Sequence, residues 1–208
     1  MEIISHRGLW NNLNEKNTNI AFHSSFKNKF GTETDIRDYN GNLVISHDIA
    51  DANSLKFEEF ITIYNQYQHK TLALNIKSDC LSTNLSYLLK KHKIENYFVF
   101  DMSIPDTINY KNVGLNFYIR QSEYEINLPF YEECTGIWLD CFNSIWYNES
   151  NILSHIRNNK KVCIVSSDLH KRDNNILWNM LSEKELYKID NLILCTDYPL
   201  EAQKYFNL

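Results

Sequence analysis

The sequence contains little glycine and proline, with only 5 Gly and 3 Pro in 208 residues. That scarcity excludes collagen-like sequence and long flexible Pro/Gly linkers. No stretch approaches the ~20 consecutive apolar residues that a membrane-spanning helix needs. The N-terminal Met-Glu-Ile-Ile is not followed by the basic and apolar segments of a secretory leader. We therefore expect no membrane span and a cytoplasmic location.

Cysteines are few, odd in number and widely separated, and none form a C-x-x-C pair. This pattern fits reduced, mostly buried thiols better than a disulfide framework or a zinc site. The five residues are Cys80, Cys134, Cys141, Cys163 and Cys195.

Positive charge is also scarce, because 21 basic residues face 26 acidic ones and the formal net charge is −5. A chain without a broad basic field is poorly suited to nucleic acid, although a local basic pocket is compatible with this balance. Hydrophobic residues make up 43% of the chain and charged residues 23%, which is enough apolar material for a packed core. The length suits one domain, and we predict a single domain over residues 1–208.

Eight short apolar runs, each about as long as a buried strand, recur along the chain. Several are continuously apolar, as in Val162–Val165, which is typical of parallel strands covered by helices on both faces. The runs are Glu2–Ser5, Thr32–Arg37, Thr71–Ile76, Tyr97–Met102, Val113–Ile119, Gly136–Phe142, Val162–Ser166 and Leu192–Thr196.

Helical patterns separate many of these runs, and no helix is expected between Tyr118 and Thr135. Eight strands alternating with helices predict an α/β fold, a compact (β/α)8 TIM barrel. The alternative is a doubly wound open sheet, but no G-x-G-x-x-G follows any strand. The predicted helices are Asn17–Lys29, Ser82–His92, Ser150–Asn158, Asn174–Leu181 and Leu200–Phe206.

Ionisable residues gather where the first strands end, which is the functional edge of such a barrel. Glu33 and Asp35 are two residues apart, so on a strand they point to the same side and repel each other unless a charge intervenes. A hard divalent cation would neutralise them. Together with His6, His47, Arg7 and Lys77, they form the residue set of a phosphoryl-transfer site. The alternative interpretation is that Glu33 and Asp35 are salt-bridged to Arg7 and Arg37.

Further polar residues follow the later strands. Asp140 follows the sixth run, and Asp168 and His170 follow the seventh. The loops after strands seven and eight often build a substrate or phosphate pocket in this fold. We expect Asp140 and His170 to contact substrate, and a solvated loop is the alternative for the segment of Asp168 and His170.

Taken in order, the motifs resemble those of the glycerophosphodiester phosphodiesterase family, in the PLC-like phosphodiesterase superfamily of TIM barrels. The middle of the chain is divergent, and a finer similarity is to a bacterial branch found with surface-polysaccharide genes. The matching segments are His6-Arg7-Gly8, Asn17-Thr18, Ala21-Phe22, Glu33-x-Asp35, His47-Asp48 and Thr196-Asp197-Tyr198-Pro199.

The resemblance implies a phosphoric diester hydrolase with Mg²⁺ or Ca²⁺ and a small-molecule phosphodiester substrate. His6 and His47 match the paired general acid and base. Glu33 and Asp35 match metal ligands, and the third ligand, a Glu in the family, falls on Asn75 here. Arg7 matches a phosphate contact and Lys77 the Lys of the same third-strand motif. The usual Glu before Asn17-Thr18 is Lys16.

The replacement by Asn75 leaves three alternatives open. An amide oxygen is a neutral ligand that holds a hard cation less tightly. Asp140 or Asp101 would supply the missing carboxylate in a second version of the site. In a third version the chain binds a phosphate or sugar phosphate without cleaving it. Retention of both His6 and His47 favours the enzyme, because a binding protein needs no proton-transfer pair.

Overall fold

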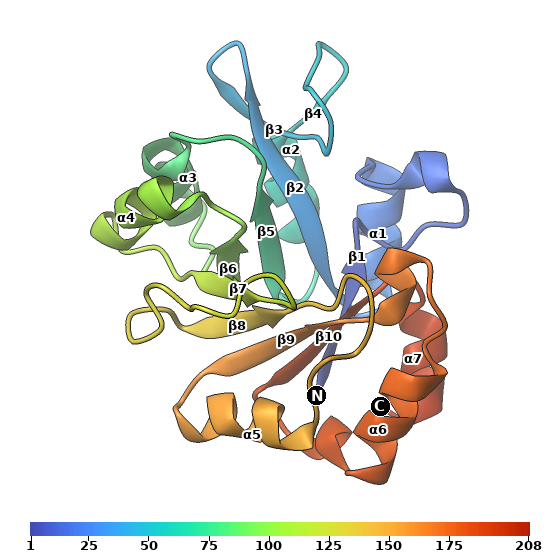
Figure 1. Cartoon of the computed structure of the whole chain (residues 1–208). Helices are drawn as coiled ribbons and strands as arrows, with labels where there is room; N and C mark the ends of the chain where they lie inside the picture. Colours follow the sequence, from blue (N-terminus) through green and yellow to red (C-terminus); the bar gives the residue numbers. More distant parts are fainter. The chain divides into compact units, whose positions relative to one another are not determined.

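The computed structural model describes all residues from Met1 to Leu208, and strands and helices alternate along them (Figure 1). The chain divides into two compact units. The N-terminal unit is His6–Phe117, and the C-terminal unit combines Met1–Ser5 with Tyr118–Leu208. The assignment of the whole chain to one domain stays a prediction. None of the helices is long and apolar enough to span a bilayer.

The C-terminal unit is built on parallel strands that pair in the order β1, β10, β9, β8 and β7. Both β8 and β10 are buried at every residue, as expected for strands covered on two faces. The strands are β1 (Glu2–His6), β7 (Tyr118–Gln121), β8 (Gly136–Leu139), β9 (Lys161–Val165) and β10 (Leu192–Thr196). The helices are α5 (Glu149–Arg157), α6 (Asn175–Glu183) and α7 (Pro199–Phe206), with short 3-10 helices at Ser167–His170 and Leu186–Lys188.

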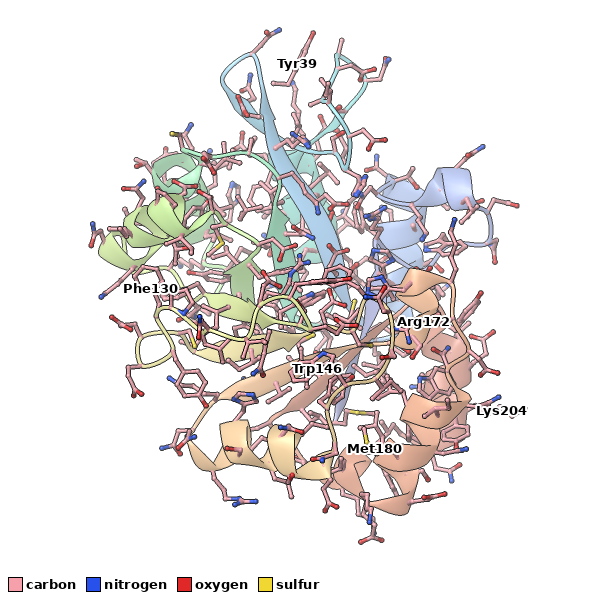
Figure 2. All side chains as sticks on the ribbon, viewed as in Figure 1. Tyr39, Phe130, Trp146, Arg172, Met180 and Lys204 are labelled. Atoms are coloured by element: carbon pink, nitrogen blue, oxygen red, sulfur yellow. The ribbon has the colours of Figure 1, made fainter.

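The N-terminal unit contains three parallel strands in the order β2, β5 and β6. The end of β2 pairs antiparallel with β3, and β3 pairs antiparallel with β4. Tyr39 lies near the tip of this antiparallel segment (Figure 2). The strands are β2 (Gly31–Tyr39), β3 (Asn42–Ile45), β4 (Leu55–Lys56), β5 (Leu72–Ile76) and β6 (Tyr97–Phe100). The helices are α1 (Asn19–Lys27), α2 (Phe57–Tyr64), α3 (Ser82–Lys91) and α4 (Ile104–Asn112), with a 3-10 helix at Leu13–Glu15.

The turn between β2 and β3 follows from its sequence. Asn40 and Gly41 have φ values of +48° and +78°, and Tyr39 pairs with Asn42 across the turn. Asn-Gly is the preferred pair for a two-residue hairpin in which both central residues have positive φ. This hairpin begins the antiparallel segment, and His47 lies in the loop that follows β3.

Aromatic packing between α1 and α2 fixes one side of the N-terminal unit. Phe22 and Phe60 meet edge to face with ring centroids 4.6 Å apart, and Phe26 and Tyr64 do the same at 5.3 Å. All four rings are almost fully buried. Such pairs add to the stabilisation from area burial alone.

The eight parallel strands coincide with the eight predicted runs. One strand begins later than predicted, and two helices were not predicted. The fifth run was expected from Val113, but β7 begins only at Tyr118, because Val113 caps the C-terminus of α4. Neither α2 nor α4 was predicted. As expected, no helix lies between β7 and β8, all five cysteines are free thiols, and four of the five are buried.

The buried His155 makes the stability of the protein pH-dependent. Its residue is 7% exposed, and its ring nitrogens lie 2.9 Å from the Tyr131 hydroxyl and 2.8 Å from the Gln121 amide oxygen. Burial lowers the pKa of His155 from its ordinary value of 6.5. The folded state therefore holds this ring neutral at a pH where the unfolded chain binds a proton.

We expect the free energy of unfolding to decrease as the pH falls below about 6.5, the unfolded pKa of histidine. The contribution of His155 is fully present above that value and is lost toward its lower folded pKa. Urea unfolding between pH 7.5 and pH 5 measures it, with the His155→Gln variant as the comparison. An equally steep loss in both proteins would remove His155 as the cause.

Candidate active site

Two neighbouring strands place three oxygen-bearing side chains on one face of the N-terminal unit. Glu33 and Asp35 are two residues apart on β2, and Asp35 is paired in register with Asn75 of β5. Because side chains alternate across a strand, all three point to the same side. Their residues are 1%, 0% and 7% exposed.

The Asp35 carboxylate holds three groups around it. Arg7 Nε lies 2.8 Å from Oδ2, and Lys77 Nζ lies 3.4 Å from Oδ1. The Asn17 amide donates a hydrogen bond of 2.8 Å to Oδ2. A buried carboxylate needs this degree of pairing to stay charged. Arg7 is thus the partner of Asp35, as in the alternative interpretation, but Arg37 is not.

Glu33 is held less completely than Asp35. Burial, and then the neighbouring Asp35 charge, raise the pKa of Glu33 to about 8, against the opposite effects of Arg7, Lys77 and a hydrogen bond from Asn75. His6 Nε2 lies 3.8 Å from Glu33 Oε2, beyond hydrogen-bond distance. The site therefore contains a carboxylate that is costly to keep charged without a further cation.

Three buried oxygens on this face accept no hydrogen bond: Oε2 of Glu33, Oδ1 of Asp35 and Oδ1 of Asn75. Of these, Oδ1 of Asp35 has an ion-pair contact with Lys77 at 3.4 Å. Buried acceptors without partners are rare in folded proteins and mark places where an ion or a ligand fits. Carboxylate and amide oxygens are ligands for a hard divalent cation. No group of three His, Cys, Asp or Glu side chains is placed to hold a metal ion, and the third oxygen on this face belongs to the Asn75 amide.

The backbone at Arg7 and Gly8 follows a course that few residues allow. Arg7 has a φ of +60°, its N–H donates to the Glu33 carbonyl at 3.0 Å, and its carbonyl accepts from Asn17 N–H at 2.9 Å. Gly8 has a φ of +85° and donates to Thr32 Oγ1 at 3.0 Å. A non-glycine residue with positive φ carries strain that the surrounding structure must offset. This geometry directs the Arg7 side chain to Asp35.

Gly8→Ala is expected to destabilise the protein. A Cβ at Gly8 would lie 2.6 Å from the Cβ of Ala21 and 2.7 Å from the carbonyl carbon of Ala21. We expect a loss of about 3 kcal/mol or more in the free energy of unfolding. The matched control is Gly41→Ala, since Gly41 also has positive φ but no atom within 4 Å of an added Cβ. It should cost roughly 1 kcal/mol, from the backbone alone. Equal urea midpoints for the two variants would contradict this account.

His47 lies on the loop after β3, and both its ring and its backbone carbonyl are held by neighbouring side chains. Its Nδ1 lies 2.9 Å from Asp48 Oδ1, and its carbonyl accepts from the Arg37 guanidinium at 3.2 and 3.3 Å. Ser46 N–H donates to the Asp35 carbonyl, which ties the loop to β2. The His47 side chain is 47% exposed. Its Nδ1 is therefore the ring nitrogen engaged by Asp48, while the ring stays accessible to solvent.

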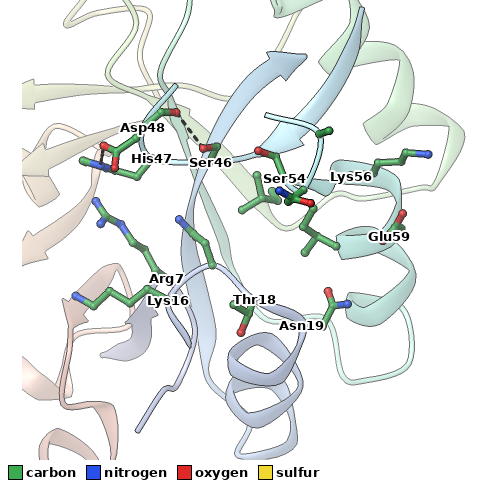
Figure 3. Close-up of a pocket in the computed structure, with 15 residues that line it drawn as sticks. Arg7, Lys16, Thr18, Asn19, Ser46, His47, Asp48, Ser54, Lys56 and Glu59 are labelled. Carbon is green, nitrogen blue, oxygen red and sulfur yellow. Dashed lines mark hydrogen bonds and ion pairs between the residues drawn. The ribbon is translucent and has the colours of Figure 1, made fainter. Parts of the chain in front are cut away.

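A cavity of about 630 Å³ adjoins these residues within the N-terminal unit. Arg7, Asn17 and His47 line it, and Figure 3 shows Arg7 and Lys16 extending to the same side as His47. Cavities of this size accommodate small-molecule ligands. The cavity reaches Arg7 and His47 of the candidate site.

Asp140 and His170 lie in the C-terminal unit and contact each other. His170 Nε2 lies 2.7 Å from Asp140 Oδ1, which also accepts from Cys141 N–H at 2.8 Å. Arg120 Nη1 lies 3.7 Å from the other carboxylate oxygen, and Asp140 is 4% exposed. Their expected contact with substrate stays a prediction, as does a role of Asp140 or Asp101 as a metal ligand. Asp168 has a structural role, since it accepts hydrogen bonds from Thr196 Oγ1 and Asp197 N–H.

Three residues shape the site through contacts that were not predicted from the sequence. Asn17 bridges Thr34 and Asp35, because its Oδ1 accepts from Thr34 Oγ1 at 2.8 Å while its amide donates to Asp35. Arg37 holds the His47 carbonyl, and Trp10 Nε1 donates to the His6 carbonyl at 3.1 Å. Only Asn17 carried a signal in the sequence, its place in the Asn17-Thr18 motif.

Comparison with solved structures finds close similarity over the full chain. The structure superposes on an Oleispira antarctica phosphodiesterase in complex with the product sn-glycerol-3-phosphate, with a TM-score of 0.73, 15% identity and coverage of 100% of this chain and 97% of that one. A glycerophosphodiester phosphodiesterase from Agrobacterium tumefaciens matches with a TM-score of 0.71, 13% identity and coverage of 99% and 98%. One from Parabacteroides distasonis matches with a TM-score of 0.67, 15% identity and coverage of 99% and 96%.

No protein-family model and no curated protein matches the chain. At 13–15% identity, the structural likeness shows the fold. The predicted (β/α)8 barrel is confirmed.

Proposed function

We propose that the protein is a metal-dependent phosphodiesterase that cleaves glycerophosphodiesters or related diesters. The observation that carries this proposal is the buried face of Glu33, Asp35 and Asn75, with three oxygens that accept no hydrogen bond beside Arg7 and Lys77. The fold shared with glycerophosphodiester phosphodiesterases supports it, as does the sn-glycerol-3-phosphate bound to one of these structural neighbours.

Glu33, Asp35 and Asn75 are the residues that would hold the cation, Mg²⁺ or Ca²⁺. When bound, the cation supplies positive charge to the phosphate oxygens as negative charge builds up on them. Arg7, 19% exposed, and Lys77, 21% exposed, reach the surface of the same face. Their guanidinium and ammonium groups bind the phosphate and stabilise that developing charge.

His6 and His47 divide the proton transfers. One takes a proton from the nucleophile, and the other gives a proton to the alkoxide that leaves when the P–O bond breaks. Because Nδ1 of His47 is hydrogen-bonded to Asp48, proton transfer by His47 would use its Nε2. The nucleophile is either water, which gives a phosphomonoester directly, or a neighbouring substrate hydroxyl, which gives a cyclic phosphate first.

A non-catalytic phosphate-binding protein is the second candidate, and the neutral Asn75 amide favours it. Chelated protein, assayed on glycerophosphodiesters before and after Mg²⁺ or Ca²⁺ is restored, separates the two. Cation-dependent release of alcohol supports the enzyme. Binding of the diester without turnover supports the alternative.

A further inference from the structure

Asn17 lies between the segment of Arg7 and strand β2, and its N–H and both ends of its side-chain amide are engaged there. Its N–H donates to the Arg7 carbonyl at 2.9 Å. Its side-chain NH2 group donates to Asp35 Oδ2 at 2.8 Å, and its Oδ1 accepts from Thr34 Oγ1 at 2.8 Å. Asn17 therefore connects the backbone of Arg7 to two neighbouring side chains of β2.

The backbone at position 17 suits asparagine. Asn17 has a φ of +61°, and asparagine is one of the few residues with a side chain that adopt this left-handed region readily. Glycine would tolerate the same backbone, but it has no amide to offer to Asp35. The position thus combines an unusual backbone conformation with a side-chain donor aimed at a carboxylate.

The orientation of the Asn17 amide follows from its two neighbours on β2. A carboxylate only accepts hydrogen bonds, so the NH2 group faces Asp35 and the amide oxygen faces away from it. The Thr34 hydroxyl meets that oxygen as a donor, and Thr34 is fully buried. With both contacts made, the amide is held in one orientation.

These contacts give the two oxygens of Asp35 different surroundings. Oδ2 receives the Asn17 amide and lies 2.8 Å from Arg7 Nε. Oδ1 accepts no hydrogen bond and has an ion-pair contact with Lys77 at 3.4 Å. Because one carbon atom joins the two oxygens rigidly, holding Oδ2 also fixes where Oδ1 lies. Oδ1 is thereby kept on the buried face that carries the other two oxygens of the candidate cation site.

We propose that Asn17 is a positioning residue for the cation: by holding Oδ2 of Asp35, it keeps Oδ1 directed to the site that Asp35 would share with Glu33 and Asn75. This inference rests on the proposed function. Asn17 acts through Asp35 and is not itself a ligand, since its own amide oxygen is taken by the Thr34 hydroxyl.

The test removes the Asn17 side chain without straining the backbone. Asn17→Gly keeps a residue that tolerates positive φ and deletes both side-chain hydrogen bonds. Calorimetric titration with Mg²⁺ and Ca²⁺, without substrate, should show cation binding weakened at least about tenfold, the scale for loss of a group that orients a metal ligand. The matched control is Asn159→Gly, the same exchange at a φ of +59° on the exposed segment after α5. It should bind the cation as the wild type does.

A second pair of variants reaches Asn17 without changing it. Thr34→Val removes the hydroxyl that holds the Asn17 oxygen, whereas Thr34→Ser keeps a hydroxyl. Cation binding should weaken in Thr34→Val and stay near that of the wild type in Thr34→Ser. A merely structural role would lower the urea midpoint in chelator without changing the cation affinity of the folded protein, so urea unfolding accompanies the titrations.

Wild-type cation affinity in folded Asn17→Gly would overturn the inference and leave the proposed function intact. If Asn17→Gly does not fold, the Thr34 pair decides, and equal affinities of Thr34→Val and Thr34→Ser would refute the inference. Cation binding by the wild type without turnover of any diester would overturn the proposed function, while the titrations would still decide the role of Asn17. A wild-type protein that binds neither cation would overturn both.

Discussion

His6→Ala and His47→Ala each lower the rate of diester cleavage by at least ~10²-fold, the usual scale for loss of a general acid or base. His6 stands 3.8 Å from Glu33 Oε2 at the end of β1, and the Nδ1 of His47 is engaged by Asp48. On the proposed function, each ring exchanges a proton with a diester held by Arg7. Steady-state kinetics at saturating cation measure the effect.

His92→Ala is the matched control, because His92 belongs to the same unit and faces only the surface residue Glu58 at 3.4 Å. It should retain the wild-type rate. Circular dichroism and urea midpoints should show all three variants folded, since His47 is on an exposed loop and His6 contributes no apolar core. A near-wild-type rate in either active-site variant would remove that histidine from the mechanism.

Glu33→Gln is expected to abolish cation binding or weaken it at least about tenfold. Glu33 supplies one of only two carboxylates on the buried face, and the remaining oxygen donor, Asn75, is neutral. In chelator the same variant should be more stable than the wild type, because it removes a buried carboxylate that burial and Asp35 disfavour. Calorimetric titration with Mg²⁺ and Ca²⁺, and urea unfolding with and without chelator, measure the two effects.

The reciprocal variant, Asn75→Glu, should tighten cation binding if Asn75 is a ligand, since it adds an anionic oxygen on β5 next to Asp35. Asp140→Asn tests the competing assignment in the C-terminal unit. Loss of cation binding in Asp140→Asn, together with no change in Asn75→Glu, would show that Asp140 completes the site. Equal affinity of Glu33→Gln and the wild type would exclude the buried face altogether.

Strand positions were predictable because short, continuously apolar runs such as Val162–Val165 are typical of buried parallel strands. The helix α2 escaped prediction although Phe57, Phe60, Ile61 and Tyr64 are spaced for one buried helical face. These four apolar residues lie so close together that they are equally compatible with a short strand. The pattern of α4 is weaker, since the apolar Ile104 and Ile108 are exposed whereas Thr107 and Tyr110 are buried.

Within the candidate site, alternation along β2 placed Glu33 and Asp35 on one face correctly. Of the two arginines considered as salt-bridge partners, the spacing did not distinguish Arg7, which pairs with Asp35, from Arg37, which does not. Arg7 reaches Asp35 through a positive φ at Arg7 itself, and this backbone conformation leaves no sequence signal in an arginine. Arg37 turns instead to the His47 carbonyl, because the hairpin after β2 returns the chain to that point.

The most direct test of the central claim follows both products of one reaction. Chelated protein is incubated with a glycerophosphodiester, and phosphomonoester and free alcohol are quantified before and after Mg²⁺ or Ca²⁺ is restored. We predict equal amounts of the two products, formed only with the cation present and not by Glu33→Gln. A folded, cation-loaded protein that binds the diesters and releases neither product would contradict the assignment as a phosphodiesterase.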